Sequence, residues 1–453
     1  MESSQLTWGK LSAIRSLAAG GCLLLACAAA AEAPVYEAPP TLSADLLLPL
    51  GLRQGPHHQV AEEVANDGYL NTYLIESDYG LFTARGDDLL RVRVAEVGAL
   101  AALSEVTRSE AFAEAAAAAA KRPFETAANV ATRPLGTIKR LPSGVSRYFK
   151  RTARKVRKTA RKVDEYLDER KEDSEAGESE AGADPTGAAD GEEESTLEKT
   201  REVATKTTKR YLGVGRSMRE WARKLGVDPY TTNETLRREL ERVAGAASVG
   251  SFGVRLTAPS FGALDSLGEV NDLVWTRSAA DLEVLNVHRL KEIGLARDEI
   301  EALLDNPAYS PSRLTGLVAA VHGLAGVPGC DALVRLAGAA ASEEEAFFFQ
   351  RSAEMLRAYH REVFPVRRIV SGDAWGGGLT DRGTLTMPLA LDYLAWTEDA
   401  AAALSTAAVS VRSQAGVERF ELWLAGRASP RAREELERLG CAVEERVRER
   451  WLE

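Results

Sequence analysis

The sequence predicts a mainly helical α+β protein that carries one highly charged insert. Three observations support this class. Most of the chain places apolar residues at helical spacing behind Ser, Thr or Asp caps. Runs typical of strands gather around residues 69–85 and again after residue 365. Between them the charges are sorted into a basic and an acidic block. We expect a signal peptide (1–31), a β-hairpin with a long helix (32–120), the charged insert (121–212), a helical bundle (213–364) and a small α/β module (365–453).

The start of the chain is typical of an export signal. Two basic residues precede the apolar run Leu17–Ala31, which is short for a membrane-spanning helix and suits a signal peptide. Cleavage after Ala31 would leave Glu32 first, and Ala31-x-Ala33 is an equally permissible cleavage site. Two alternatives stay open: Leu24–Cys27 resembles a lipobox, in which Cys27 would be acylated, or the run stays as an uncleaved anchor. We therefore expect an exported protein of the periplasm or cell envelope.

The first part after the leader predicts a small α+β unit. Glu32–Leu50 is rich in Pro and Ala and is expected to be an extended lead-in. Tyr69–Glu76 and Leu81–Arg85 are strand-like and flank a turn that ends in Gly, which predicts a hairpin. Asp87 or Asp88 then caps a long helix that runs to about residue 120.

The basic half of the insert is the one candidate interaction surface. Residues 121–163 hold 14 Lys or Arg and one acid, a net charge of +13. Arg147–Arg170 lacks Pro and Gly, so a helix of about six turns is allowed. Its apolar residues recur with a period of 3.5, which gives a thin apolar edge beside a broad cationic face. The candidate binding residues are Arg147, Lys150, Arg151, Arg154, Lys155, Arg157, Lys158, Arg161 and Lys162.

Three interpretations of this segment remain open. The helix could lie on an anionic membrane surface. It could pack its apolar edge on a partner helix, as in a coiled coil. It could also be a solvated helix whose charge is balanced by the acidic block, residues 164–198, which carries 15 acids and two bases, a net of −13. Glu172–Glu194 has no aromatic or branched aliphatic residue and is predicted to be disordered.

Residues 213–364 predict a bundle of capped helices long enough to bury a core. Thr231 with Glu234, and Ser342 with Glu345, match the capping-box pattern. Gly245–Gly268 is rich in Gly, Ser and Ala and would be a close-packed helix pair or a loop over a pocket. Further helices are expected at Asp281–Gly294, at Arg297–Leu304 and after Ser310-Pro311.

From Pro365 onward strands return. Val366–Val370 and Thr384–Leu391 are predicted strands around the Gly-rich loop Gly372–Gly378, expected to be a hairpin connection or, through Trp375, a ligand lid. A strand–helix–strand pattern follows and implies a parallel pair with a right-handed crossover. Its parts are a helix Thr397–Val411, a strand Arg419–Ala425, a helix from Ser429-Pro430 to Leu439 and a strand Ala442–Arg446.

No motif with a known chemistry is present in the sequence. It contains no His-Glu-x-x-His, Cys-x-x-Cys, Gly-x-Ser-x-Gly or Gly-x4-Gly-Lys, and its histidines are scattered at positions 57, 58, 288, 322 and 360. We assign no catalytic, cofactor-binding or metal-ligating residue and expect no cofactor. Cys330 and Cys441 remain once the leader is removed; they could pair in an oxidising compartment, but two separate buried thiols are expected.

Four stretches carry a likeness to known proteins: Gly55–His58, Asn66–Asn71, Leu225–Asn233 and Asp305–Pro311. With them the chain resembles a group of exported proteobacterial proteins of unassigned function, over most of its length after the leader. The resemblance implies export and a variable charged insert. It implies no activity and no functional residue.

These observations predict an exported, envelope-associated interaction or scaffold protein that meets an anionic membrane surface or a protein partner through its basic helix. The alternative is a periplasmic, hydrolase-like enzyme with a pocket between the helical bundle and the C-terminal module. The overall net charge of −10 and the export signal argue against nucleic-acid binding.

Overall fold

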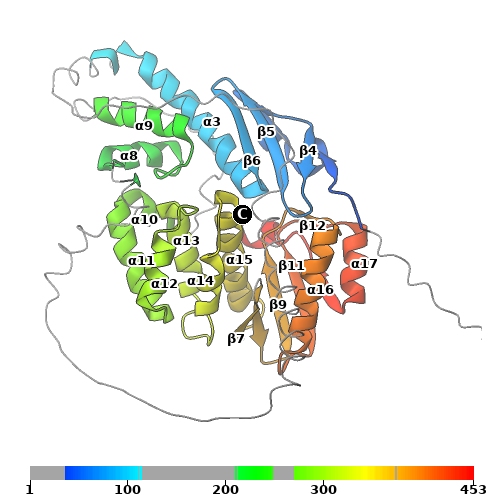
Figure 1. Cartoon of the computed structure of the whole chain (residues 1–453). Helices are drawn as coiled ribbons and strands as arrows, with labels where there is room; N and C mark the ends of the chain where they lie inside the picture. The colour runs from blue at the N-terminus through cyan, green and yellow to red at the C-terminus, as the bar shows by residue number, and fades with distance from the viewer. Residues whose placement is uncertain are drawn as a thin grey trace, which may run out of the picture. The chain divides into compact units, whose positions relative to one another are not determined.

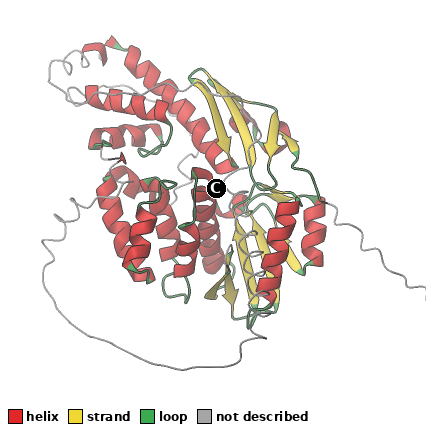
Figure 2. Ribbon diagram, viewed as in Figure 1, coloured by secondary structure: helices red, strands yellow, loops and turns green. Residues whose placement is uncertain are grey.

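The computed structural model describes residues 36–114 except 111, residues 210–247 except 212, and residues 270–452 except 373 and 374. Helices outweigh strands in these ranges, so the predicted mainly helical α+β class is confirmed (Figure 2). The predicted leader, nearly all of the insert and most of Gly245–Gly268 lie outside the described residues. None of the helices in the described ranges combines the length and the apolarity that crossing a bilayer requires.

The N-terminal sheet is antiparallel and has six strands. Strand β5 is its centre: β4 pairs with the start of β5 and β3 with its end on one edge, while β6 pairs along the other edge. The strands are β1 Thr41–Ser43, β2 Gln54–Gly55, β3 His58–Val60, β4 Glu63–Asn66, β5 Asn71–Ser77 and β6 Gly80–Arg85.

The expectation of an extended lead-in up to Leu50 is wrong from Thr41 onward. Strand β1 pairs with β4, and two short helices follow, α1 (Ala44–Leu47) and α2 (Leu50–Arg53). Ala44, Leu48 and Leu52 are buried in the apolar cluster that also contains Tyr73 and Ile75 of β5. Burial against the sheet overrides the local Pro- and Ala-rich composition.

Helix α3 (Asp87–Arg108) follows the sheet and contacts β5 and β6. It ends at Arg108, because the chain at Ser109 leaves the helical conformation and the Ser109 hydroxyl donates to the carbonyl of Val106. Helical residues resume at Glu110 and at 112–114, and residues 115–120 of the predicted helix lie outside the described ranges. The prediction that Asp87 or Asp88 caps this helix is wrong: Gly86 is the N-cap residue, and both acids lie in the first turn, where the helix dipole favours acids.

The middle of the chain supplies eight helices within the described ranges. The end of α3, α8, α9, α10 and the start of α11 share one apolar cluster, whereas α12 to α15 join a larger cluster with the C-terminal sheet. The helices are α8 Arg216–Leu225, α9 Glu234–Ala247, α10 Asn271–Thr276, α11 Ala279–Ile293, α12 Arg297–Leu304, α13 Pro311–His322, α14 Asp331–Ala337 and α15 Glu343–Glu362.

The predicted capping box at Thr231 is wrong. Asn233 caps α9 instead, since its Oδ1 accepts from the N–H groups of Thr235 (3.1 Å) and Leu236 (3.2 Å). The Thr231 hydroxyl donates to the buried carboxylate of Glu96. The Thr231 hydroxyl, which the local pattern assigned to the cap, therefore binds a residue that is distant in the sequence.

The C-terminal sheet has five strands in the order β13-β11-β9-β8-β7. Strands β9, β11 and β13 are parallel, and β7, β8 and β9 form an antiparallel meander. In Figure 1 the sheet lies between α15 on one side and α16 with α17 on the other. The elements are β7 Val366–Ser371, β8 Gly376–Thr380, β9 Thr384–Leu389, α16 Glu398–Arg412, β11 Arg419–Leu424, α17 Pro430–Arg438, β13 Cys441–Glu444, the short pair β10 Tyr393–Leu394 with β12 Arg427–Ala428, and α18 Arg448–Trp451.

The Gly-rich stretch is in part a strand, not a loop or a lid. A Cβ on Gly377 would lie 2.5 Å from the carbonyl oxygen of Thr386 on the adjacent strand, and one on Gly376 would lie 2.9 Å from Leu333. Trp375 is buried in the core. The glycines are therefore explained by close packing of α14 and β9 against β8.

Candidate functional site

A cluster of buried charged residues lies where β9 and β11 end. Both strands are parallel, so their carboxyl ends meet at one edge, the place where open α/β sheets usually carry their sites. Asp392 follows β9 and Gly426 follows β11. A Cβ on Gly426 would lie 1.8 Å from the carbonyl oxygen of Asp392, so only glycine allows the two connections to pass this closely.

The Asp392 carboxylate is buried and accepts three hydrogen bonds. Its donors are the backbone N–H of Asn71 (3.0 Å), the backbone N–H of Asp87 (3.1 Å) and the guanidinium of Arg448 (3.3 Å). These donors come from β5, the start of α3 and the start of α18. One carboxylate thus joins the N-terminal sheet, the long helix and the end of the chain.

Asp88 is the second buried carboxylate of the cluster. It accepts from Arg448 at 2.5 Å and from Arg351 of α15 at 3.2 Å. Arg351 in turn donates to Glu354, one turn further along α15, at 2.6 Å. Two guanidinium groups therefore clamp one carboxylate, and all three side chains are buried.

A third, half-buried carboxylate, that of Asp87, faces Tyr73 and Asn71. The Tyr73 hydroxyl donates to Asp87 Oδ1 at 2.6 Å, and the Asn71 amide donates to the same oxygen at 3.2 Å and to the Tyr73 hydroxyl at 2.9 Å. Asn66 holds Asn71 in place through its own amide at 3.0 Å. The side chain of Asp87 is thereby fixed beside Asp392.

The environment moves the acids of this cluster in opposite directions. Burial, and then the charge of Asp87, raise the pKa of Asp392 well above its usual value, against the opposing effect of Arg448. Burial also acts to raise the pKa of Asp88, but Arg448 and Arg351 outweigh it and lower that pKa below the usual range. Burial and the charge of Asp87 raise the pKa of the Tyr73 phenol. The cluster thus holds two carboxyls whose pKa values are moved in opposite directions.

Two further buried polar networks are present, one joining α3 to α15 and one joining the α8–α9 connection to α13. Arg93 donates to Glu96 (2.8 Å), to the Thr232 hydroxyl (2.9 Å) and to Glu343 of α15 (3.1 Å). Separately, Asp228 is buried and accepts from the Ser312 hydroxyl at 2.6 Å. Nearby, the Arg313 guanidinium lies 3.7 Å from the ring centre of Phe347. Buried charges of this number are costly, so they mark the α3–α15 contact as the part of the fold with the strictest requirements.

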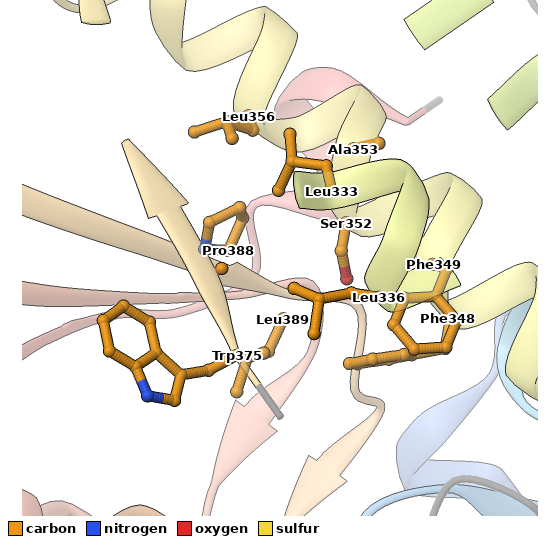
Figure 3. Close-up of a pocket in the computed structure, with 11 residues that line it drawn as sticks. Leu333, Leu336, Phe348, Phe349, Ser352, Ala353, Leu356, Trp375, Pro388 and Leu389 are labelled. Carbon is orange, nitrogen blue, oxygen red and sulfur yellow. The ribbon is translucent and has the colours of Figure 1, made fainter. Parts of the chain in front are cut away.

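An apolar pocket lies between α14, α15, β8 and β9, with a cavity volume of about 40 Å³, enough for two or three waters or a short alkyl group (Figure 3). Its polar side-chain atoms are the Ser352 hydroxyl and the Trp375 indole nitrogen. The Ser352 hydroxyl accepts from the backbone N–H of Ala390 at 3.1 Å. The pocket can bind a small apolar group; its lining holds no carboxylate or imidazole. It is lined by Leu333, Leu336, Phe348, Phe349, Ser352, Ala353, Leu356, Trp375, Gly376, Pro388 and Leu389.

The histidines do not form a shared centre. His58 is buried and bonds the carbonyl of Leu52, and His360 accepts from the backbone N–H of Val366 at 3.0 Å. His322 bonds Glu292 at 2.7 Å, and His288 lies 3.7 Å from the same carboxylate on the surface. Across the described ranges, no three His, Cys, Asp or Glu side chains are arranged to hold a metal ion. Cys330 and Cys441 are free and buried.

The nine predicted binding cations of residues 147–162 lie outside the described residues. The structure does describe where the insert joins the fold. Phe112 before it and Tyr211 after it belong to the same apolar cluster. Arg242 of α9 lies 5.8 Å from the ring centre of Phe112, and Tyr211 packs edge-on against Tyr230 at 5.8 Å. The described residues on both sides of the insert therefore pack in the same apolar cluster.

Sequence reasoning named Asp87 and Asp88 only as helix caps and missed Asp392, Arg448 and Arg351. The adjacent acids at the start of a long helix were the one local signal, because two acids exceed what a cap needs. The comparisons add no relative: the chain matches no family model, no curated protein and no solved structure.

Proposed function

We propose that this chain is an exported interaction protein of the cell envelope, and that it meets an anionic surface through the basic segment Arg147–Lys162. The proposed kinship with exported proteobacterial proteins is consistent with the same location. The observation that carries the proposal is the charge of residues 121–163, +13 in a chain whose overall charge is −10. Each Lys or Arg near an anionic lipid surface contributes about 1 kcal/mol to membrane binding.

The way the insert joins the fold supports this function. The described residues that flank the insert, Phe112 and Tyr211, belong to one apolar cluster, so the insert is connected to a single part of the fold. The buried acids described above are already engaged by Arg448, Arg351 and Arg93. The basic segment therefore does not have to compete with the core for these carboxylates.

The test is co-sedimentation of the chain from Glu32 onward with anionic and neutral vesicles. Replacing the nine cations of residues 147–162 by Gln should greatly weaken binding to the anionic vesicles, and rising salt should weaken binding by the unchanged chain. The control replaces Arg431, Arg433 and Arg438 of α17 by Gln, which removes surface cations already paired with Glu434, Glu435 and Glu445. Equal binding by the nine-Gln variant and the unchanged chain would reject the proposal.

A second candidate is a hydrolase-like enzyme of the periplasm. The observation that favours it is the pocket between α14–α15 and β8–β9, whose lining residue Leu389 lies three positions before Asp392. The backbone N–H of Asp87 donates to the Asp392 carboxylate. Asp392 and Asp88 share Arg448, and their pKa values are moved in opposite directions, which is a common acid–base arrangement. A screen of ester and amide substrates tests it. Turnover that is lost in Asp87→Asn would support this candidate, and turnover unchanged in that variant would remove it.

A further inference from the structure

The start of the described chain exposes an apolar tip. Leu46 of α1 is 80% exposed and Leu50 of α2 is 64% exposed, and Pro49 between them is exposed as well. Leu46, Leu50 and Tyr36 are three of the six large hydrophobic residues that are exposed in the described ranges. A single exposed leucine needs no explanation, but two on adjoining short helices form a patch.

The tip is held firmly in its outward position. Ala44, Leu48 and Leu52 already fill the core positions beneath it, so neither exposed leucine can replace them without repacking. Backbone bonds fix the turn: Ala44 N–H donates to Glu62 at 2.9 Å, Leu48 N–H to Ala44 at 2.9 Å and Leu52 N–H to Pro49 at 3.0 Å. The charges beside the tip, Asp45 and Arg53, form an ion pair. The apolar side chains therefore need no refolding to leave water.

We propose that Leu46 and Leu50 insert into the headgroup interface of the lipid bilayer across which the leader would export the chain. The sequence before the described residues supports this occupant: Tyr36 is nine positions after Cys27, at the end of the lipobox pattern, a reach of at most about 30 Å. A chain held at Cys27 would keep the tip near the membrane. The inference rests on the proposed envelope location, and it adds an apolar contact that does not depend on anionic lipid.

Neutral phosphatidylcholine vesicles in high salt test the tip separately from the basic segment, because screening suppresses the cationic contribution. The chain from Glu32 onward should bind, and Leu46→Ser with Leu50→Ser should bind at least about tenfold more weakly. The matched control is Val409→Ser, since Val409 of α16 is 65% exposed and lies elsewhere in the fold. The nine-Gln variant should keep its binding to neutral vesicles although its binding to anionic vesicles is much weaker.

A fluorescence measurement covers the case in which the serine variants alter folding. In Leu46→Trp the emission should shift to the blue on adding vesicles, and in Val409→Trp it should not. Binding of the serine pair equal to that of the unchanged chain, absence of binding by the unchanged chain, or a dimer that forms through the tip without vesicles would each overturn the inference. A cytoplasmic chain that still binds neutral vesicles through the tip would contradict the proposed location and leave the contact itself standing.

Discussion

Arg448 of the C-terminal helix donates to Asp88 in the first turn of α3, with 2.5 Å between Nη1 and Oδ1. The same guanidinium donates to Asp392 at 3.3 Å. The end of the chain is thereby tied to its N-terminal third through a residue pair that is 360 positions apart. The stability of the fold should depend strongly on this contact.

Arg448→Met should lower the free energy of unfolding by about 3–5 kcal/mol, because it leaves Asp88 and Asp392 buried with less compensation. Urea denaturation measures the loss. The control, Arg446→Met, removes an exposed cation paired with Glu449 at 2.7 Å and should cost less than about 1 kcal/mol. A similar small loss in both variants would show that the cluster does not hold the fold together.

Gly426→Ala should be among the most destabilising single changes in the chain. The added methyl would lie 1.8 Å from the Asp392 carbonyl oxygen, which belongs to backbone that cannot move aside cheaply. Gly245→Ala in α9 is the matched change, since nothing lies within 4 Å of its added Cβ and alanine favours helix by about 1 kcal/mol. The melting temperature should fall sharply for Gly426→Ala and rise slightly for Gly245→Ala. The reverse order would contradict the packing described.

Asp392 should make a contribution to the free energy of unfolding that depends on pH. Its pKa is raised in the folded chain, so its stabilising contribution is complete below the unfolded value near 3.9 and is lost as pH rises through the raised value. Asp88 has a lowered pKa, and its contribution is present above that unfolded value and lost as pH falls toward the folded one.

Asp392→Asn separates the two acids. Measured by urea unfolding from acid to neutral pH, the stability of the unchanged chain relative to this variant should decline as pH rises. Asp381→Asn, at an exposed loop carboxylate 3.5 Å from Arg367, serves as the control and should show no such trend. A constant difference, or one that grows with pH, would contradict a raised pKa at Asp392.

The thiols should be slow to react in the folded chain. Burial raises the pKa of Cys441 to about 12 and raises that of Cys330 as well, so both stay protonated and covered. Alkylation of the chain from Glu32 onward should be slow under native conditions and complete at both positions in urea without reductant. Failure to label either residue in urea would indicate a disulfide instead.

Local signals in the sequence were enough to predict the class and many of the elements. Ser310-Pro311 and Ser342 behave as the start signals predicted, with each hydroxyl accepting from the N–H three residues on. The cap at Thr231 failed because Glu96, far away in the chain, takes its hydroxyl. The prediction of a loop at Gly376–Gly378 failed because these glycines are required by the close packing of α14 and β9 against β8, which the local sequence does not show.

The candidate cluster was beyond the reach of sequence reasoning for the same reason. Asp88, Arg351, Asp392 and Arg448 come from four segments, and only tertiary packing brings them together. Carboxylates and guanidinium groups are too common in this chain for their types alone to mark a site. The basic segment, in contrast, was evident because its signal is local charge density.

The central claim is that the chain leaves the cytosol and meets an anionic surface through its cations. Fractionation of the cells that make it, with the mass of the purified chain, tests this most directly. We expect a chain that begins at Glu32 or at an acylated Cys27 and sediments with the envelope. With Cys27→Ser also present, so that no acyl anchor can form, the nine-Gln variant should shift toward the soluble fraction. A chain that begins at Met1 in the cytoplasm, or a variant that sediments unchanged, would contradict the account.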